Sequence, residues 1–475
     1  TDPAAGVKKV PLLTLTAMVV GGMVGAGVFS LPRRFASETG VYGALIAWAI
    51  AGSGMLMLAF VFQNLAVRKP DLDSGVYAYA KAGFGEYLGF FSAFGYWASA
   101  CVGNTTYWVL IGSTLGGVIP AFGEGDTLAS VALGTVGVWL FATLILRGVE
   151  DAAAINRIVT VAKIIPILVF IVLCVFALDV EVFLDNMSGG PEVGSLFDQV
   201  RGTMLATVFV FLGIEGASVY SRYAQRREDV GRSTVLGFLM VLAIFASVTI
   251  VSYGILPRAE IADLRQPSMA GVLEEAFGGW ASVFVSVGLI VSVLGAYLAW
   301  ALMSAEVLFV AAGDDDMPAF LGRTNSKRAP APALLLSAAL VQSMLVITLL
   351  SDNAFDFMLN MTSALSLFPF ALAAGYALKL AVTRESYEVA PEGRTRELVI
   401  AALATVYTVF LLFAAGTEYM LVSFVIYAPG TILFFMARRE QGRRLFDAKE
   451  LAILAVSCVL AAVGVVGLVN GTITI

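Results

Sequence analysis

The sequence contains no histidine and only three cysteines among its 475 residues. The lack of histidine excludes an imidazole proton relay and removes a very common ligand of protein-bound transition metals. Cys101, Cys174 and Cys458 each lie within an apolar segment, where cysteine behaves as a small hydrophobic side chain. The sequence therefore predicts no disulfide framework, no metal site and no cofactor.

Charged residues are also scarce, at 13% of the chain, whereas hydrophobic residues make up 59%. Such a composition leaves too little polar surface for a soluble protein of this length and predicts an all-α membrane protein. About 20 apolar residues are needed for one helical span. We count thirteen such runs, and therefore expect 12 to 13 transmembrane helices, at residues 12–36, 41–67, 84–119, 126–146, 154–178, 197–222, 231–256, 278–311, 331–351, 355–383, 397–415, 418–437 and 448–470.

The linkers between these runs are too short to fold as separate soluble domains. The glycine clusters lie in the middle of apolar runs and not at a strand-to-helix turn, so they do not form a nucleotide-binding motif. This pattern argues against an ATP-driven pump. The expected surroundings are a lipid bilayer, and no nucleic acid partner is expected.

The distribution of lysine and arginine indicates the orientation, because these residues are enriched in cytoplasmic loops. With the N-terminus in the cytoplasm, most basic residues fall on the cytoplasmic side and the opposite loops are acidic. Only five arginines then lie on the opposite side: Arg33, Arg34, Arg201, Arg258 and Arg265. We therefore predict a multi-pass protein with a cytoplasmic N-terminal tail, residues 1–10.

Two glycine-rich stretches interrupt otherwise apolar runs. Residues 21–27 read Gly-Gly-Met-Val-Gly-Ala-Gly, and residues 213–217 read Gly-Ile-Glu-Gly-Ala. Lipid offers no hydrogen-bond partners, so a broken helix at membrane depth is tolerated only where protein or a water-filled cavity satisfies the backbone. Paired breaks at corresponding positions of two halves predict a binding site near the middle of the membrane.

The breaks divide the chain into two similar halves. Five runs in residues 11–178 are followed by five in residues 197–383, and each set begins with a broken helix. Because five is an odd number, the second set is expected to be inverted in the membrane. The sequence thus predicts a transport core of residues 11–383, with discontinuous helices 1 and 6, and additional helices in residues 397–475.

At both breaks the chain resembles the amino acid, polyamine and organocation transporters, and within them the basic amino acid antiporters of prokaryotic cytoplasmic membranes. The resemblance rests on residues 21–32 and 211–218, with support from residues 147–149 and 311–318. A thirteenth run and residues 215–221 are most similar to the branch that exchanges arginine for ornithine. The resemblance implies alternating access and allows a homodimer, which no motif requires.

The first break supplies the expected site for a substrate carboxylate. Helix N-termini carry partial positive charge, so the amides at Met23, Ala26 and Gly27 are predicted to bind an anion. Alternatively, these glycines only allow close helix packing. Relatives often have serine where this chain has Ala26, so the backbone amides are expected to supply the contacts.

The second break contains Glu215, whose carboxylate is costly at membrane depth unless it is paired, hydrated or protonated. Together with the carbonyl groups around Gly213, it is predicted to bind the substrate ammonium or a proton. The resemblance implies that this glutamate couples substrate occupancy to opening. The alternative is a permanent hydrogen bond to the backbone of the break.

Lys163 is the unexpected residue of the fifth run, because an ammonium at membrane depth needs a partner. In sodium-independent relatives, a lysine at this place substitutes for a bridging sodium ion. Lys163 could instead extend to the cytoplasmic surface. Glu306 is a further candidate for a coupling or gating role on the inner side.

Four more residues match substrate-cavity positions of an arginine/agmatine-exchanging relative. Trp300 takes the place of an indole that stacks on guanidinium, and cation–π contacts of this kind stabilise by about 0.5–2 kcal/mol. Phe209 replaces a second tryptophan, Tyr96 is interpreted as a lid residue, and Asn104 as a polar cavity residue. Trp300 could instead belong to an interfacial belt, and Asn104 could bind a neighbouring helix.

We therefore predict a secondary transporter, and not an enzyme, that exchanges cationic amino acids, with arginine and ornithine as the expected pair and lysine as a further substrate. The alternative is a proton-coupled, sodium-independent permease for lysine or for many amino acids. An intramembrane enzyme would need a nucleophile with a base, or metal ligands. A channel would need a continuous polar lining, which the apolar runs do not provide.

Overall fold

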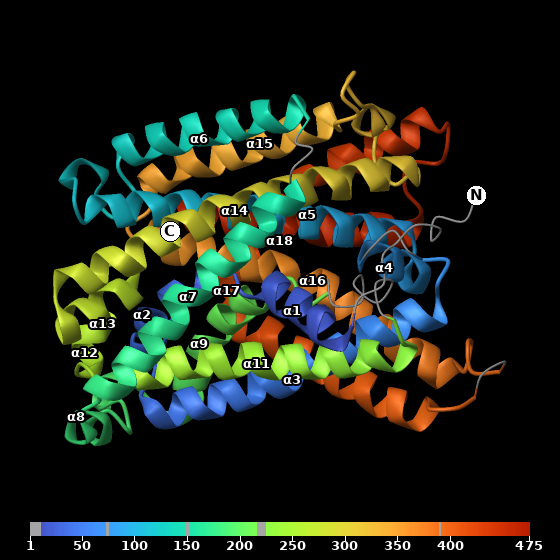
Figure 1. The fold of residues 1–475 in the computed structure, drawn as a ribbon. Helices are drawn as coiled ribbons and strands as arrows, with labels where there is room; N and C mark the ends of the chain where they lie inside the picture. The colour runs from blue at the N-terminus through green and yellow to red at the C-terminus, as the bar shows by residue number, and fades with distance from the viewer. Residues whose placement is uncertain (1–10, 73–75, 149–151, 216–224, 389–390) are drawn as a thin grey trace. The chain divides into compact units, whose positions relative to one another are not determined.

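In the computed structural model, the chain is helical and the described residues contain no strand (Figure 1). The structure describes residues 11–72, 76–148, 152–215, 225–388 and 391–475. The predicted tail, residues 1–10, lies outside the described residues, as do Gly216 and Ala217 of the second break.

Eight of the described helices are each long and apolar enough to cross a membrane. A bent pair of shorter helices, Leu12–Met23 and Ala26–Ala36, makes a further span. The predicted all-α membrane fold is therefore confirmed, and its division into two inverted repeats stays a prediction.

The first of two compact units comprises Thr1–Pro70, Arg157–Val293 and Leu380–Tyr407. Within it, α1 packs along α11, and α3 packs along both α9 and α11 (Figure 1). Its helices are α1 (Leu12–Met23), η1 (Ala26–Ser30), α2 (Leu31–Ala36), α3 (Val41–Arg68), most of α7 (Ala152–Ala177), α8 (Val180–Asp185), η3 (Pro191–Val193), α9 (Leu196–Phe211), α11 (Arg227–Ser252), α12 (Arg258–Ala262), α13 (Ser268–Phe277) and the first parts of α14 (Gly279–Gly313) and α17 (Arg394–Glu440).

The second unit comprises Asp71–Asn156, Leu294–Lys379 and Thr408–Ile475. Within it, α5 packs against α4, α6 and α15. Its helices are α4 (Val76–Phe84), α5 (Glu86–Gly116), η2 (Pro120–Phe122), α6 (Leu128–Leu146), the second part of α14, η5 (Ala319–Gly322), α15 (Ala331–Ile347), η6 (Thr348–Leu350), most of α16 (Ala354–Thr383), the second part of α17 and α18 (Ala448–Val469).

Several helix ends follow local sequence signals. The Ser195 side chain accepts a hydrogen bond from the Asp198 amide at the start of α9, and Asp447 with Glu450 forms a capping box at the start of α18. The predicted runs 397–415 and 418–437 correspond to the two parts of α17, which is broken at Gly416, where φ is 78°. Positive φ favours glycine because other residues clash there.

Small residues allow large rings to approach the long helices. A Cβ atom on Gly95 of α5 would lie 1.8 Å from the Tyr427 hydroxyl oxygen, and one on Gly137 of α6 would lie 2.0 Å from the Trp108 ring. Close packing of this kind holds membrane helices together, because lipid removes most of the hydrophobic driving force between them. These glycines therefore set how closely α5, α6 and α17 pack.

Candidate functional site

The first glycine-rich stretch forms a break in the structure. α1 ends at Met23 and η1 begins at Ala26, and the two helical segments of this span are bent by 54°. Val24 and Gly25 between them have extended backbone angles, and no side chain caps η1 in the described structure. The first N–H groups of a helix have no acceptor within that helix. The break therefore presents amide donors at Ala26 and Gly27, both of which are buried.

Lys163 of α7 binds the other side of this break. Its Nζ donates a hydrogen bond to the Gly21 carbonyl oxygen at 2.6 Å, and the residue is 6% exposed. The lysine thus does not extend to the surface, which was the alternative that the sequence left open. It satisfies a carbonyl group in the last turn of α1.

The second glycine-rich stretch begins where α9 ends at Phe211. Residues 212–215 form a turn in which Gly213 has a φ of 104°, a conformation that L side chains rarely adopt. The Gly213 amide donates to Glu215 Oε2 at 3.2 Å, and Glu215 is 9% exposed. This contact is of the kind expected if Glu215 stabilises the backbone of its own break.

The two breaks contact each other within the first unit. A Cβ atom on Gly213 would lie 2.9 Å from the Gly22 carbonyl oxygen, and one on Gly27 would lie 2.7 Å from two ring carbons of Phe209. The structure thus brings together seven of the candidates: Met23, Ala26, Gly27, Lys163, Phe209, Gly213 and Glu215.

Tyr96 and Trp300 lie in the second unit, on α5 and α14. The Tyr96 hydroxyl donates to the sulfur atom of Met303 at 3.4 Å, and Met303 lies about one helical turn after Trp300. Both aromatic residues are partly exposed. Tyr96 and Trp300 therefore lie on neighbouring helices, at about the same position along the helix axes.

Asn104 and Glu306, in the same unit, have different surroundings. Asn104 is 1% exposed, and its Oδ1 is buried without a hydrogen-bond partner among the described residues. Glu306 is exposed, and in the described part of the chain it forms no ion pair.

The chemistry available at the two breaks is that of backbone amides, carbonyl oxygens, one ammonium and one carboxylate. Amides at a helix start bind carboxylates, and carbonyl oxygens at an unwound segment bind cations. Among the described residues, no group of three or more His, Cys, Asp or Glu side chains is placed to hold a metal ion. The arrangement suits a zwitterion better than an isolated anion.

Sequence reasoning missed three participants: the carbonyl groups of Gly21 and Gly22, and Met303. The two carbonyl groups belong to the predicted break, but their partners Lys163 and Gly213 lie far away in the sequence. Met303 carries no distinctive signal, because methionine is common in apolar helices. Only its contact with Tyr96 reveals it.

Comparison with known proteins gives matches over almost the whole chain. The model of the amino acid permease family matches residues 11–437, a range that contains both breaks and every candidate residue. The chain is 46% identical to an arginine/ornithine antiporter of Pseudomonas aeruginosa, over 98% of this chain and 99% of that protein. It is 40% identical to an L-lysine transport protein of Corynebacterium glutamicum, over 99% and 97% of the two chains. It is 36% identical to an arginine/ornithine antiporter of Latilactobacillus sakei, over 98% of both chains.

Proposed function

Because this chain belongs to the amino acid permease family, we propose that it exchanges cationic amino acids across a membrane, with arginine and ornithine as the pair. Relatives named arginine/ornithine antiporters match nearly their full length. The observation that carries the proposal is the contact between the break in the first span and the turn at the end of α9, where Gly213 lies against the Gly22 carbonyl group and Lys163 binds that of Gly21.

In this proposal the break between α1 and η1 holds the substrate carboxylate. The amides near Met23, Ala26 and Gly27 supply the donors, and partial positive charge at the start of η1 adds to the attraction. The carbonyl groups around Gly213, with Glu215, bind the substrate ammonium. Lys163 holds the break open without sodium.

The side chain of the substrate is assigned to Trp300, Tyr96, Asn104 and Phe209. Trp300 stacks on the guanidinium or ammonium group, and Tyr96 closes over it. Asn104 offers a buried oxygen atom that has no partner among the described residues. Glu306 takes a coupling role on the inner side.

The remaining parts of the proposal concern the whole chain. Residues 11–178 and 197–383 form two inverted repeats whose rocking alternates access, and residues 397–475 add helices outside the repeats. The N-terminus is cytoplasmic, the membrane is the prokaryotic cytoplasmic membrane, and two copies can associate as a homodimer. Exchange of two monovalent cations uses the solute gradients and needs no ATP.

The decisive experiment is uptake of labelled arginine into sodium-free proteoliposomes loaded with ornithine, lysine, agmatine or buffer alone. We expect uptake only into vesicles that contain a basic amino acid, with ornithine the most effective. Equal uptake into empty vesicles would contradict obligate exchange. If that uptake followed an imposed pH gradient, the alternative of a proton-coupled lysine or broad amino acid permease would replace it.

The lysine alternative has a specific observation in its favour. The L-lysine transport protein of Corynebacterium glutamicum matches this chain over almost its whole length. Competition of unlabelled lysine with labelled arginine, measured in the same vesicles, distinguishes a carrier that prefers arginine from one that prefers lysine.

A further inference from the structure

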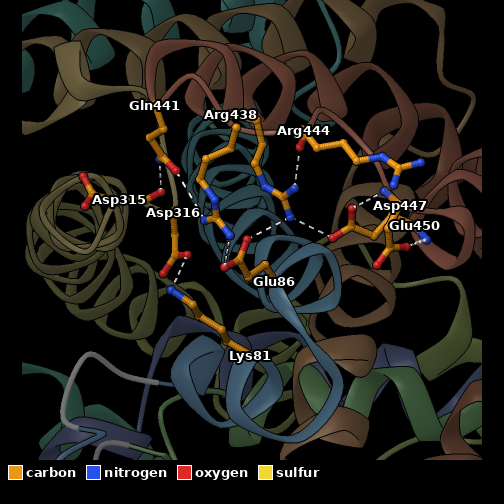
Figure 2. Close-up of polar contacts among 10 residues, drawn as sticks. Lys81, Glu86, Asp315, Asp316, Arg438, Gln441, Arg444, Asp447 and Glu450 are labelled. Carbon is orange, nitrogen blue, oxygen red and sulfur yellow. Dashed lines mark hydrogen bonds and ion pairs between the residues drawn. The ribbon is translucent and has the colours of Figure 1, made fainter.

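Arg438, near the end of α17, is a buried arginine that binds three acceptor groups. Its Nη2 forms ion pairs with Glu86 Oε2 and Glu450 Oε1, each at 2.8 Å, and its Nη1 donates to the Arg444 carbonyl oxygen at 2.7 Å (Figure 2). The residue is 9% exposed. Arg438 therefore joins the start of α5 to the start of α18.

Both carboxylates have a second partner. Glu86 Oε1 accepts from Arg443 Nη2 at 2.9 Å, and Glu450 Oε2 accepts from the Asp447 amide at 2.9 Å to complete the cap of α18. Charged groups that are partly buried and share several partners act together more strongly than isolated surface pairs. The position of α18 is thus linked to the first residue of α5.

The segment after α14 is joined to the same cluster through Gln441, whose Oε1 accepts from Arg443 Nη1 at 3.4 Å. Lys81 of α4 binds Asp316 Oδ1 through its Nζ at 2.6 Å, and the Gln441 side chain donates to the Asp315 carbonyl oxygen at 2.6 Å (Figure 2). We call the whole set the Arg438 network: Lys81, Glu86, Asp315, Asp316, Arg438, Gln441, Arg443 and Glu450.

Aromatic packing next to the network already attaches α17 to α5. The ring centroids of Tyr87 and Phe434 are 4.9 Å apart, those of Phe90 and Phe434 5.4 Å, and those of Phe94 and Tyr427 6.0 Å. These ring contacts do not include the segment after α14. The Arg438 network connects that segment to α5 through Gln441 and Arg443, beside a direct contact in which Glu440 Oε2 of α17 accepts from the Ala319 amide at 2.8 Å.

The two connected helices carry the substrate residues assigned to the second unit. Tyr96 lies ten residues after Glu86 on α5, a distance of about 15 Å along the axis. Trp300 lies on α14, whose C-terminal end leads directly into Asp315 and Asp316. A displacement of either helix end thus moves an aromatic residue of the proposed site.

We propose that Arg438 is a positioning residue that holds the starts of α5 and α18 at the end of α17, while Gln441 holds the segment after α14 there, and that these contacts set the rate at which the carrier reorients. This inference rests on the proposed function. It gives α17 and α18, which lie outside the predicted repeats, a role in transport. Substitution of Arg438 should therefore change the exchange rate and have little effect on substrate affinity.

The test compares Arg438→Gln and Gln441→Ala with Arg439→Gln. Arg439 is the exposed neighbour, and in the described part of the chain it forms no ion pair. We expect the maximal exchange rate to fall about tenfold in Arg438→Gln and less in Gln441→Ala, with KM changed by less than about twofold. We expect Arg439→Gln to match the unsubstituted protein.

Hydrogen exchange by mass spectrometry gives a readout that does not depend on transport. Amides of residues 312–322 should exchange faster in Arg438→Gln than in Arg439→Gln. If Arg438→Gln does not fold, Glu86→Gln replaces it, because it removes the carboxylate that Arg438 and Arg443 share while Arg438 keeps Glu450. The maximal exchange rate should fall in this variant with little change in KM.

The inference is overturned if Arg438→Gln and Arg439→Gln exchange at the same rate, or if the loss appears in KM. It is also overturned if the amides of residues 312–322 are equally protected in both variants. A wild-type protein that does not exchange basic amino acids would instead refute the proposed function, while the amide measurement would still test the link between α17 and the segment after α14.

Discussion

A single ammonium group supports the break in the first span. Lys163 Nζ donates to the Gly21 carbonyl oxygen at 2.6 Å, within a region that is almost inaccessible to solvent. A buried carbonyl group that loses its partner costs about 1–3 kcal/mol. The shape of the break therefore depends on one side chain from α7.

We expect Lys163→Met, which keeps most of the side-chain volume, to lower arginine exchange at least about tenfold. The physical reason is that the Gly21 carbonyl group loses its donor. Lys449→Met, at an exposed lysine of α18, is the matched control. Sodium-dependent recovery in Lys163→Met would show that the ammonium occupies a cation position, and full activity without sodium would contradict the assignment.

Glu215→Gln separates a structural role of this residue from a coupling role. The amide keeps an oxygen that can accept from Gly213 but removes the charge, so the protein should fold while exchange is slowed or loses its pH dependence. The measurement is exchange across a range of pH, with Glu260→Gln, at an exposed side chain of α12, as control. Unchanged exchange at every pH would leave Glu215 with the structural role alone.

Asp316 shows how burial affects a charged residue outside the spans. Its pKa is raised because burial outweighs the ion pair with Lys81. The pKa of an aspartate carboxyl group in the unfolded chain is about 4. When folding raises that pKa, the group stabilises the folded protein fully at a pH below about 4, and this stabilisation is lost as the pH rises through the raised, folded-state pKa. The protonated form is the one that folding favours.

We therefore expect the unfolding temperature of the wild type, relative to that of Asp316→Asn, to be highest at acidic pH. That difference should shrink as the pH rises from about 4 through the raised pKa. Thermal unfolding in detergent at several pH values measures it, and Asp315→Asn, at an exposed side chain, is the control. A difference that grows with pH would contradict the sign.

At the scale of elements, two kinds of contact hold the break in the first span against α9 and the turn that follows it. Gly27 of η1 faces the ring of Phe209 on α9, whereas Gly213 faces the backbone carbonyl group of Gly22. A side chain can adjust to an added methyl group more easily than a backbone group can. The two glycines should therefore respond differently to the same substitution.

Gly27→Ala should lower exchange about tenfold or more, because overpacking costs about 1–3 kcal/mol. Adding Phe209→Leu should recover part of the rate, since it removes the ring that the new Cβ meets at 2.7 Å. Gly213→Ala should not recover with the same second substitution, because its strain comes from a φ of 104° and from backbone. Equal recovery of both variants would show that the breaks are not packed as described.

At the scale of the whole molecule, each compact unit is assembled from three separate parts of the chain. α7, α14, α16 and α17 each contribute to both units. Folding therefore requires contacts between residues that are distant in sequence. The Arg438 network, which joins α5 to α17 and α18 and α4 to the segment after α14, is one such set.

The charge balance of exchange gives a prediction for the whole carrier. Arginine and ornithine each carry one positive charge at neutral pH, so one-for-one exchange moves no net charge. The rate should be the same with and without a potassium diffusion potential set by valinomycin. A carrier that moved one net charge would gain about 2.3 kcal/mol per 100 mV, and a corresponding acceleration would contradict strict exchange.

The helices and their ends were largely predictable, because apolar length, prolines and capping residues act locally. The predicted run 84–119 differs from α5 by two residues at its start and three at its end. The candidate site was predictable only in part. The glycine-rich sequences of residues 21–27 and 213–217 predict breaks in the backbone. No local sequence pattern predicts that Gly213 contacts Gly22 or that Arg438 binds Glu86.

The amino-acid sequence by itself determined that this chain is an all-helical membrane protein with broken helices, since lipid forces apolar length and internal hydrogen bonding on every span. Its motifs also determined the family. Only the tertiary structure decided which groups satisfy the breaks and which helices share ion pairs. Those contacts depend on how helices pack side by side, and packing brings together residues such as Lys163 and Gly21 that no local pattern connects.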